Sequence, residues 1–272
     1  MYNWASMAPW RKAGECSVSP IHRAALEGFS QEAQAYARGR PGYPDALVPW
    51  LRGQLQLGPG KAAVDLGAGT GKFTRLMLRT GATVVAVEPI EAMRAQLMES
   101  LPDVTVISGA AESMPLGAES VDAVVCAQAF HWFASHEALE EIHRVLVPGG
   151  SLGLVWNVRD ESCDWVAALN GIITPYEADA PRFHTGQWRQ AFIGDLFTEP
   201  QDVTFPYQHV GSAQETIIDR YLSVSFIAAL PAREKAQVKR RLLASIDTWP
   251  QLKGRSEIAF PYWTCAYHCR RK

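Results

Sequence analysis

The chain has 272 residues, of which 47% are hydrophobic and 20% are charged, and its formal net charge is −2. These values are typical of a globular protein with one large domain, and they favour neither nucleic acid nor an anionic membrane surface as a partner. No apolar run is long enough to span a membrane, and Met1–Ser19 lacks the apolar segment of a signal peptide. We therefore expect a cytoplasmic protein.

The five cysteines contain no C-x-x-C pair. They favour neither a disulfide framework nor a zinc site. On a strand, Cys265 and Cys269 would lie about 13 Å apart, too far to share a metal ion. We expect no metal site.

Residues 1–28 have no clear period and are interpreted as a leader that is partly disordered. The folded domain is expected over 29–272, and it begins with a short helix around Phe29 to Arg38. Arg40-Pro41-Gly42-Tyr43-Pro44 predicts a turn, after which Asp45 is placed to cap a helix that runs through Leu55.

An alternation of short apolar runs and helical patterns follows. The apolar runs are rich in β-branched residues and predict parallel strands buried on both faces: Ala62–Leu66, Thr83–Val87, Val104–Ile107, Val121–Cys126 and Ser151–Trp156. Helices are predicted between them over 72–80, 91–100 and 136–146. In such a doubly wound α/β sheet the carboxyl ends of the strands share one edge, where ligands bind.

The alternation fails after Asn157. Trp165–Tyr176, Gly186–Phe197 and Glu215–Leu243 have helical patterns, and the remaining strands are expected over Asp202–His209 and Ile258–Cys269.

A glycine-rich turn joins the first strand to the next helix. The run Val64-Asp65-Leu66-Gly67-Ala68-Gly69-Thr70-Gly71 lets the backbone approach a ligand closely, and Glu88 at the end of the second strand can accept from the hydroxyls of a ribose. A dinucleotide site favours G-x-G-x-x-G, but here the third glycine comes one residue early and Lys72 follows it. The turn therefore favours an adenosine-bearing ligand without a diphosphate.

Four motifs together give the chain a family resemblance: Asp65–Gly71, Glu88-Pro89, Gly109–Leu116 and Leu146–Gly150. In this order and spacing they resemble a class I S-adenosylmethionine-dependent methyltransferase of the small-molecule, type 11 kind. The resemblance implies a mostly parallel, seven-stranded, Rossmann-like sheet with an antiparallel edge hairpin. It also implies a helical cap over about 161–200 and 212–254.

The resemblance also implies roles for individual residues toward S-adenosylmethionine. Asp65 would orient the glycine turn or accept from the cofactor's ammonium, and Arg40 would either pair with its carboxylate or anchor the turn that follows. Many relatives have an acidic residue at the position of Ala110, so Glu112 is the alternative acceptor for the adenine amino group. Ala110 and Ala111 would still offer their backbone amides to the adenine. The remaining expected cofactor contacts are Gly67, Ala68, Gly69, Thr70, Gly71, Pro89, Ile90, Met93 and Gln128.

The loop Ala127–Phe133 is expected to face the methyl acceptor. His131 would act as a general base if the acceptor must lose a proton, or else it is a hydrogen-bonded structural residue. Trp132 and Phe133 would contact the acceptor or simply pack. An ionised carboxylate would need no base, only a cation to hold it, and Arg159, Arg182 and Arg220 are the candidates.

The sequence therefore predicts an S-adenosylmethionine-dependent methyltransferase that moves a methyl group to a small-molecule acceptor by in-line displacement. A non-catalytic member that binds the cofactor or a partner remains an alternative, as does a methyltransferase that acts on protein. A nicotinamide-dependent oxidoreductase is disfavoured by the glycine spacing. The oligomeric state is left open.

Overall fold

The computed structural model describes residues 39–178 and 180–272. The predicted leader and the helix expected around Phe29 to Arg38 lie outside the described residues. The strands form one seven-stranded sheet in the order β3-β2-β1-β4-β5-β7-β6. Their bounds are Ala62–Leu66 (β1), Thr83–Val87 (β2), Thr105–Ile107 (β3), Val121–Ala127 (β4), Leu146–Arg159 (β5), Gln201–Gly211 (β6) and Ile258–Arg270 (β7).

The sheet confirms the predicted fold class. Strands β1 to β5 pair in parallel, whereas β7 runs antiparallel to both β5 and β6. The bounds of β1 and β2 are the expected ones because runs of buried apolar residues end at sharp turns. Strand β5 is longer than expected. It pairs with β4 from Leu146 onward, and a register shift takes up the Pro148-Gly149-Gly150 segment.

The helices are α3 (Leu47–Gly53), α4 (Lys72–Leu78), α5 (Glu91–Ser100), α6 (His136–Val145), α7 (Asp164–Ile173), α8 (Arg220–Leu222), α9 (Ser225–Ala228) and α10 (Ala232–Thr248). Alternate side chains of the strands enter different clusters. On β5, Leu154 packs in the cluster that contains residues of α6, whereas Val155 packs with residues of α3 and α4. The sheet is therefore covered on both faces, as the sequence predicted.

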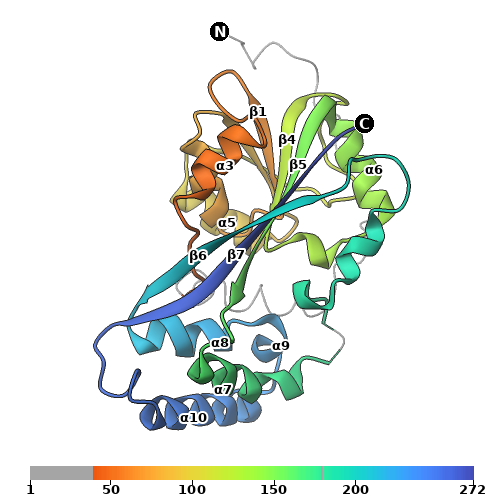
Figure 1. Cartoon of the computed structure of the whole chain (residues 1–272). Helices are drawn as coiled ribbons and strands as arrows, with labels where there is room; N and C mark the ends of the chain where they lie inside the picture. Colours follow the sequence, from red (N-terminus) through yellow and green to blue (C-terminus); the bar gives the residue numbers. More distant parts are fainter. Residues whose placement is uncertain (1–38, 179) are drawn as a thin grey trace.

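The remaining helices gather at one end of the sheet. Figure 1 shows α7, α8, α9 and α10 as a group, which we call the cap, with β6 and β7 reaching from the sheet into it. Buried residues of these helices form one cluster with Ile258, Phe260 and Tyr262 of β7. Trp188 and Phe197, which were expected in the cap, pack instead in a cluster of the sheet. No helix in the described parts of the chain is both long enough and apolar enough to cross a membrane.

Three local predictions are wrong. Asp45 does not cap α3, whose N-cap is Ala46, because its carboxylate binds Arg79 at 2.6 Å. The segment 186–197 forms a short 3₁₀ helix, Gln187–Ala191, rather than an α-helix, and its Trp188 packs among the rings of Phe183 and Tyr267. The single long helix expected over 215–243 is divided into a π-helix (Gln214–Asp219), α8, α9 and α10.

Candidate functional site

The glycine turn between β1 and α4 has the conformation that its residues allow. Gly67, Gly69 and Gly71 all have positive φ angles, of 71°, 57° and 83°. A Cβ on Gly67 would lie 2.6 Å from the Cβ of Ala129, so this glycine permits close contact with the loop after β4. A Cβ on Gly69 would meet nothing within 4 Å. The open side of Gly69 therefore faces space rather than packed protein.

Glu88 connects this turn to the end of β2. Its Oε2 accepts from the backbone N–H of Gly69 at 2.8 Å, and its Oε1 accepts from Ile90 N–H at 2.9 Å. The side chain is buried, and burial raises the pKa of the carboxyl. Because a carboxylate oxygen accepts more than one hydrogen bond, both oxygens retain acceptor capacity for a ligand.

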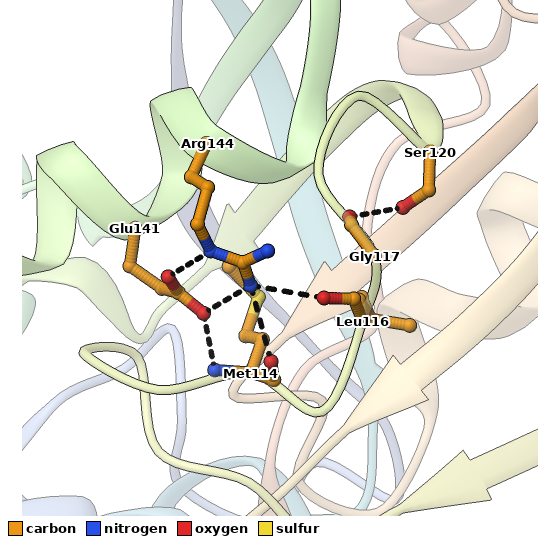
Figure 2. A network of polar contacts seen from close by, with 6 residues as sticks. All are labelled: Met114, Leu116, Gly117, Ser120, Glu141 and Arg144. Atoms are coloured by element: carbon orange, nitrogen blue, oxygen red, sulfur yellow. Dashed lines mark hydrogen bonds and ion pairs between the residues drawn. The ribbon is translucent and has the colours of Figure 1, made fainter. Parts of the chain in front are cut away.

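The loop after β3 is held by a polar network that Figure 2 shows. The guanidinium of Arg144 on α6 binds the Glu141 carboxylate through Nε at 2.6 Å and donates to the carbonyl of Leu116 at 3.0 Å. Glu141 in turn accepts from the N–H of Met114 at 2.6 Å. The network fixes the chain that directly follows Gly109–Glu112.

These loops surround one central pocket at the carboxyl edge of the sheet, with about 1250 Å³ of empty space including its mouth. Most of the predicted site residues line it: Arg40, Gly67, Ala68, Gly69, Thr70, Glu88, Pro89, Ile90, Met93, Ala110, Ala111, Glu112, Gln128, Trp132 and Phe133.

Four of the predicted residues do not line the pocket. Gly71 is the N-cap of α4, behind the turn. Asp65 is fully buried, accepts from the Thr74 hydroxyl at 2.6 Å, and has its pKa raised to about 7 by burial. Asp65 therefore braces the glycine turn against α4 from inside the protein. The other two predicted residues outside the pocket lining are His131 and Arg159.

His131 has the features of the structural alternative rather than of a general base. Its Nδ1 accepts from the indole N–H of Trp156 at 3.1 Å, which leaves the hydrogen of a neutral ring on Nε2. Although part of the residue reaches the surface, burial and the charges of Arg182 and Arg40 lower the pKa of the ring to about 3. The prediction that His131 meets the acceptor in the pocket is not supported by this placement.

Arg159 ends β5 beside the cap. Its Nη1 donates to Asn170 Oδ1 at 3.0 Å, and its guanidinium lies 4.2 Å from the centre of the Tyr221 ring. Of the three arginines considered for an acceptor carboxylate, Arg220 lines the pocket, whereas Arg159 and Arg182 do not.

Sequence reasoning did not place Lys72 and Asn157 in the site. Lys72 begins α4 and donates from Nζ to the carbonyl of Arg40 at 2.5 Å. Asn157 lies near the carboxyl end of β5 and donates to the carbonyl of Gly42 at 2.8 Å. A polar residue that ends an apolar strand at the ligand-binding edge was the available signal for Asn157.

Gly39 explains how the 40–43 segment reaches the pocket. A Cβ on this residue would lie 2.6 Å from the backbone carbon of Asp219, so only glycine allows the chain to cross the junction of the Gln214–Asp219 π-helix and α8 so closely. Arg40, the next residue, donates to the carbonyl of Ser223 at 3.1 Å. The crossing brings Arg40 and Arg220 to the same wall of the pocket.

Comparisons with known proteins identify the family of this chain. Residues 64–154 match the family model described as a methyltransferase domain. A methyltransferase-like protein of Schizosaccharomyces pombe is 36% identical over 250 residues, which cover 91% of this chain and 96% of that protein. An uncharacterised methyltransferase of Mycobacterium tuberculosis is 37% identical over 241 residues, or 87% of this chain and 92% of that protein.

A solved structure shows the same fold. A proposed type II methyltransferase from Anaeromyxobacter dehalogenans superimposes with a TM-score of 0.57 at 24% identity, covering 85% of this chain and 96% of that chain. The fold, the glycine turn and the relatives together define a class I methyltransferase. This chain belongs to the type 11 family of S-adenosylmethionine-dependent methyltransferases.

Proposed function

We propose that this methyltransferase binds S-adenosylmethionine in the central pocket and transfers its methyl group to a small-molecule acceptor. The observation that supports the proposal most directly is the position of Glu88, whose carboxylate joins the first two loops and lines the pocket beside the open face of Gly69. An adenosine ribose needs a hydrogen-bond acceptor in such a place, and its neighbouring backbone must lack side chains.

The other pocket residues also fit the cofactor. Ile90 and Met93 supply an apolar wall for an adenine. Glu112, which follows Ala110 and Ala111 in the same loop, is an acidic residue of the pocket lining. Arg40 offers a cation for the carboxylate of the cofactor's amino-acid part.

The bound cofactor supplies a methyl group on a sulfonium, which the nucleophilic atom of the acceptor attacks in line while the carbon–sulfur electron pair leaves on sulfur. The residues of this chain hold and align the reactants and exclude water. Trp132 and Phe133 form an apolar part of the wall on the fourth loop. No proton transfer is assigned to His131, because its ring holds the Trp156 indole.

Isothermal titration tests the donor. S-Adenosylmethionine and S-adenosylhomocysteine are each expected to bind the folded protein, and absence of binding at high micromolar concentration would overturn the donor assignment. Replacing Glu88→Ala is expected to weaken binding by about 1.5–3 kcal/mol because charge-assisted hydrogen bonds are lost. Glu91→Ala, which changes an exposed carboxylate three residues later, is the matched control and should leave the affinity unchanged.

The size of the acceptor needs a separate experiment. The protein is incubated with methyl-labelled cofactor and a cell extract, which is then divided by ultrafiltration. Label in the small-molecule fraction supports the proposal. Label confined to protein would replace it with a protein methyltransferase, and absence of any label transfer despite cofactor binding would favour a non-catalytic member.

A further inference from the structure

Cations gather where the wall of the central pocket meets the helical cap. Arg40, Lys72 and Arg220 line the pocket. Arg159 and Arg182 lie close enough for the charges to act on one another: Arg159 and Arg40 act on both Arg182 and Arg220. Burial and this mutual repulsion lower the pKa of Lys72 to about 8, of Arg220 to about 9 and of Arg182 to about 10.

Arg220 is the most enclosed of these cations. The residue is 7% exposed, and its Nε and Nη1 have no hydrogen-bond partner in the described part of the chain. The nearest acids along the chain are engaged elsewhere, since Glu215 binds Ser212 and Asp219 binds Gln214. The Tyr262 hydroxyl also acts on this guanidinium, but a hydroxyl is not a counterion. A buried guanidinium without a counterion costs much free energy, and the described residues supply none, so this arrangement favours an anionic ligand.

Arg159 adds a second incompletely paired guanidinium. Its Nη1 binds Asn170, but its buried Nε and Nη2 have no hydrogen-bond partner among the described residues. No ion pair joins it to a described acid: Asp160 accepts from Ser162, Glu161 accepts from Asn170, and Glu177 lies 3.4 Å from Arg182. The guanidinium is held over the Tyr221 ring, which fixes its direction.

The cofactor by itself would not neutralise the cluster. S-Adenosylmethionine carries one carboxylate, one ammonium and one sulfonium, so its binding adds a net positive charge. Arg40 and Lys72 adjoin the glycine turn and are placed for that carboxylate, whereas Arg220 comes from the cap. We infer that the methyl acceptor carries an oxyanion, a carboxylate or a phosphate, which Arg220 binds with the support of Arg159. The inference rests on the proposed function.

The test uses thermal unfolding of the full chain with saturating S-adenosylhomocysteine. Succinate and inorganic phosphate are titrated as oxyanion probes, succinamide serves as the uncharged match for succinate, and potassium chloride matches the ionic strength. Succinate or phosphate is expected to raise the midpoint saturably, whereas succinamide and chloride should not. The more potent probe indicates whether the group is a carboxylate or a phosphate.

Variants assign the effect to the cluster. Arg220→Met is expected to raise the half-saturating concentration of the effective anion by about tenfold to a hundredfold, because a charge-assisted hydrogen bond is lost. The midpoint without anion should be unchanged or higher, since an unpaired buried charge has been replaced by an apolar chain of similar length. Arg159→Met should weaken the response in the same direction, and it serves as the second variant if Arg220→Met does not fold. Arg240→Met, an exposed change on α10, is the matched control.

The inference is overturned if neither oxyanion acts, if succinamide or chloride acts equally, or if Arg220→Met responds like the parent. Stabilisation by S-adenosylhomocysteine alone is measured on the same samples. If it is absent, the proposed function itself fails. If it is present while the oxyanion response is absent, only the inference about the acceptor fails.

Discussion

At the scale of the residue, the pair formed by His131 and Trp156 shows how a residue type that is typical of catalysis can have a structural role. Trp156 is buried, and the only polar atom of its side chain is the indole nitrogen, whose N–H donates to His131 Nδ1 at 3.1 Å. A buried donor without an acceptor is costly, so the imidazole stabilises the core by accepting this hydrogen.

This pairing predicts how stability depends on pH. Burial lowers the pKa of His131 from 6.5 to about 3. Below pH 6.5 the unfolded chain therefore binds a proton at this ring while the folded chain does not, so the stability that His131 contributes falls as the pH drops from 6.5 toward 3. In urea unfolding at pH 7.5 and 5.5, His131→Gln should show a smaller loss on acidification than the parent.

His131→Leu separates the hydrogen bond from the titration. This variant should also lose less stability than the parent when the pH falls from 7.5 to 5.5. At pH 7.5, however, its free energy of unfolding should be lower than that of the parent by about 1–3 kcal/mol, because the indole N–H loses its acceptor. His131→Gln should lose less stability at pH 7.5, because the amide oxygen of glutamine can accept this hydrogen bond. His136→Gln, an exposed change, is the control. A parent-like acid response in both His131 variants would show that this ring does not titrate as described.

At the scale of the element, the glycine turn contains two positions that share a backbone conformation but have different surroundings. Gly67 and Gly69 both have positive φ, yet an added Cβ would meet Ala129 only at Gly67. The first glycine therefore serves packing between loops, and the second keeps the pocket open.

Alanine substitutions should distinguish these two roles. Gly69→Ala is expected to lower the free energy of unfolding by about 1–2 kcal/mol through left-handed strain, and to weaken cofactor binding by about 1–3 kcal/mol through the methyl group in the pocket. Gly67→Ala should cost about 1–3 kcal/mol more stability than Gly69→Ala because it also clashes with Ala129. Chemical unfolding and calorimetric titration measure the two effects, and equal stability losses would contradict the distinction.

The Arg144 network predicts an effect on the pocket from a residue that does not line it. Arg144→Met removes the hydrogen bonds that hold the chain at Met114 and Leu116 (Figure 2). We expect faster amide hydrogen exchange over 109–117 and weaker cofactor binding by about 0.5–2 kcal/mol. Glu140→Gln on the exposed side of α6 is the control. If amide hydrogen exchange over 109–117 is unchanged in Arg144→Met, the loop does not depend on Arg144 for its order.

The elements that the sequence predicted best are those whose cause is local. The parallel strands were predicted because short apolar runs rich in β-branched residues alternate with helical patterns, and Glu88 was placed at the pocket because it ends such a run. The 3₁₀ helix at Gln187–Ala191 was not predicted, because the packing of Trp188 against Tyr267 joins segments far apart in the chain. The position of Arg220 likewise depends on the close crossing at Gly39, which sequence periodicity does not reveal.

At the scale of the whole molecule, β7 makes the sheet and the cap one structural unit. Its carboxyl-terminal part pairs with β5 over the sheet core, while Ile258, Phe260 and Tyr262 at its other end are buried with the cap helices. Loss of cap packing must therefore disturb β7, which is a strand of the sheet. Because β7 pairs with β5, the disturbance also reaches Asn157 in the wall of the pocket. We expect sheet and cap to unfold together.

Two adjacent leucines on α10 test this expectation. Leu242 is fully buried in the cap cluster, whereas Leu243 is 44% exposed. Leu242→Ala should lower the free energy of unfolding by about 2–5 kcal/mol through the cavity that it leaves, and Leu243→Ala should change it by less than about 0.5 kcal/mol. Near-ultraviolet circular dichroism and tryptophan fluorescence should give coincident urea transitions for Leu242→Ala as for the parent. A separate early transition in that variant would mean that the cap unfolds while the sheet remains folded, because β7 would then fail to couple the two.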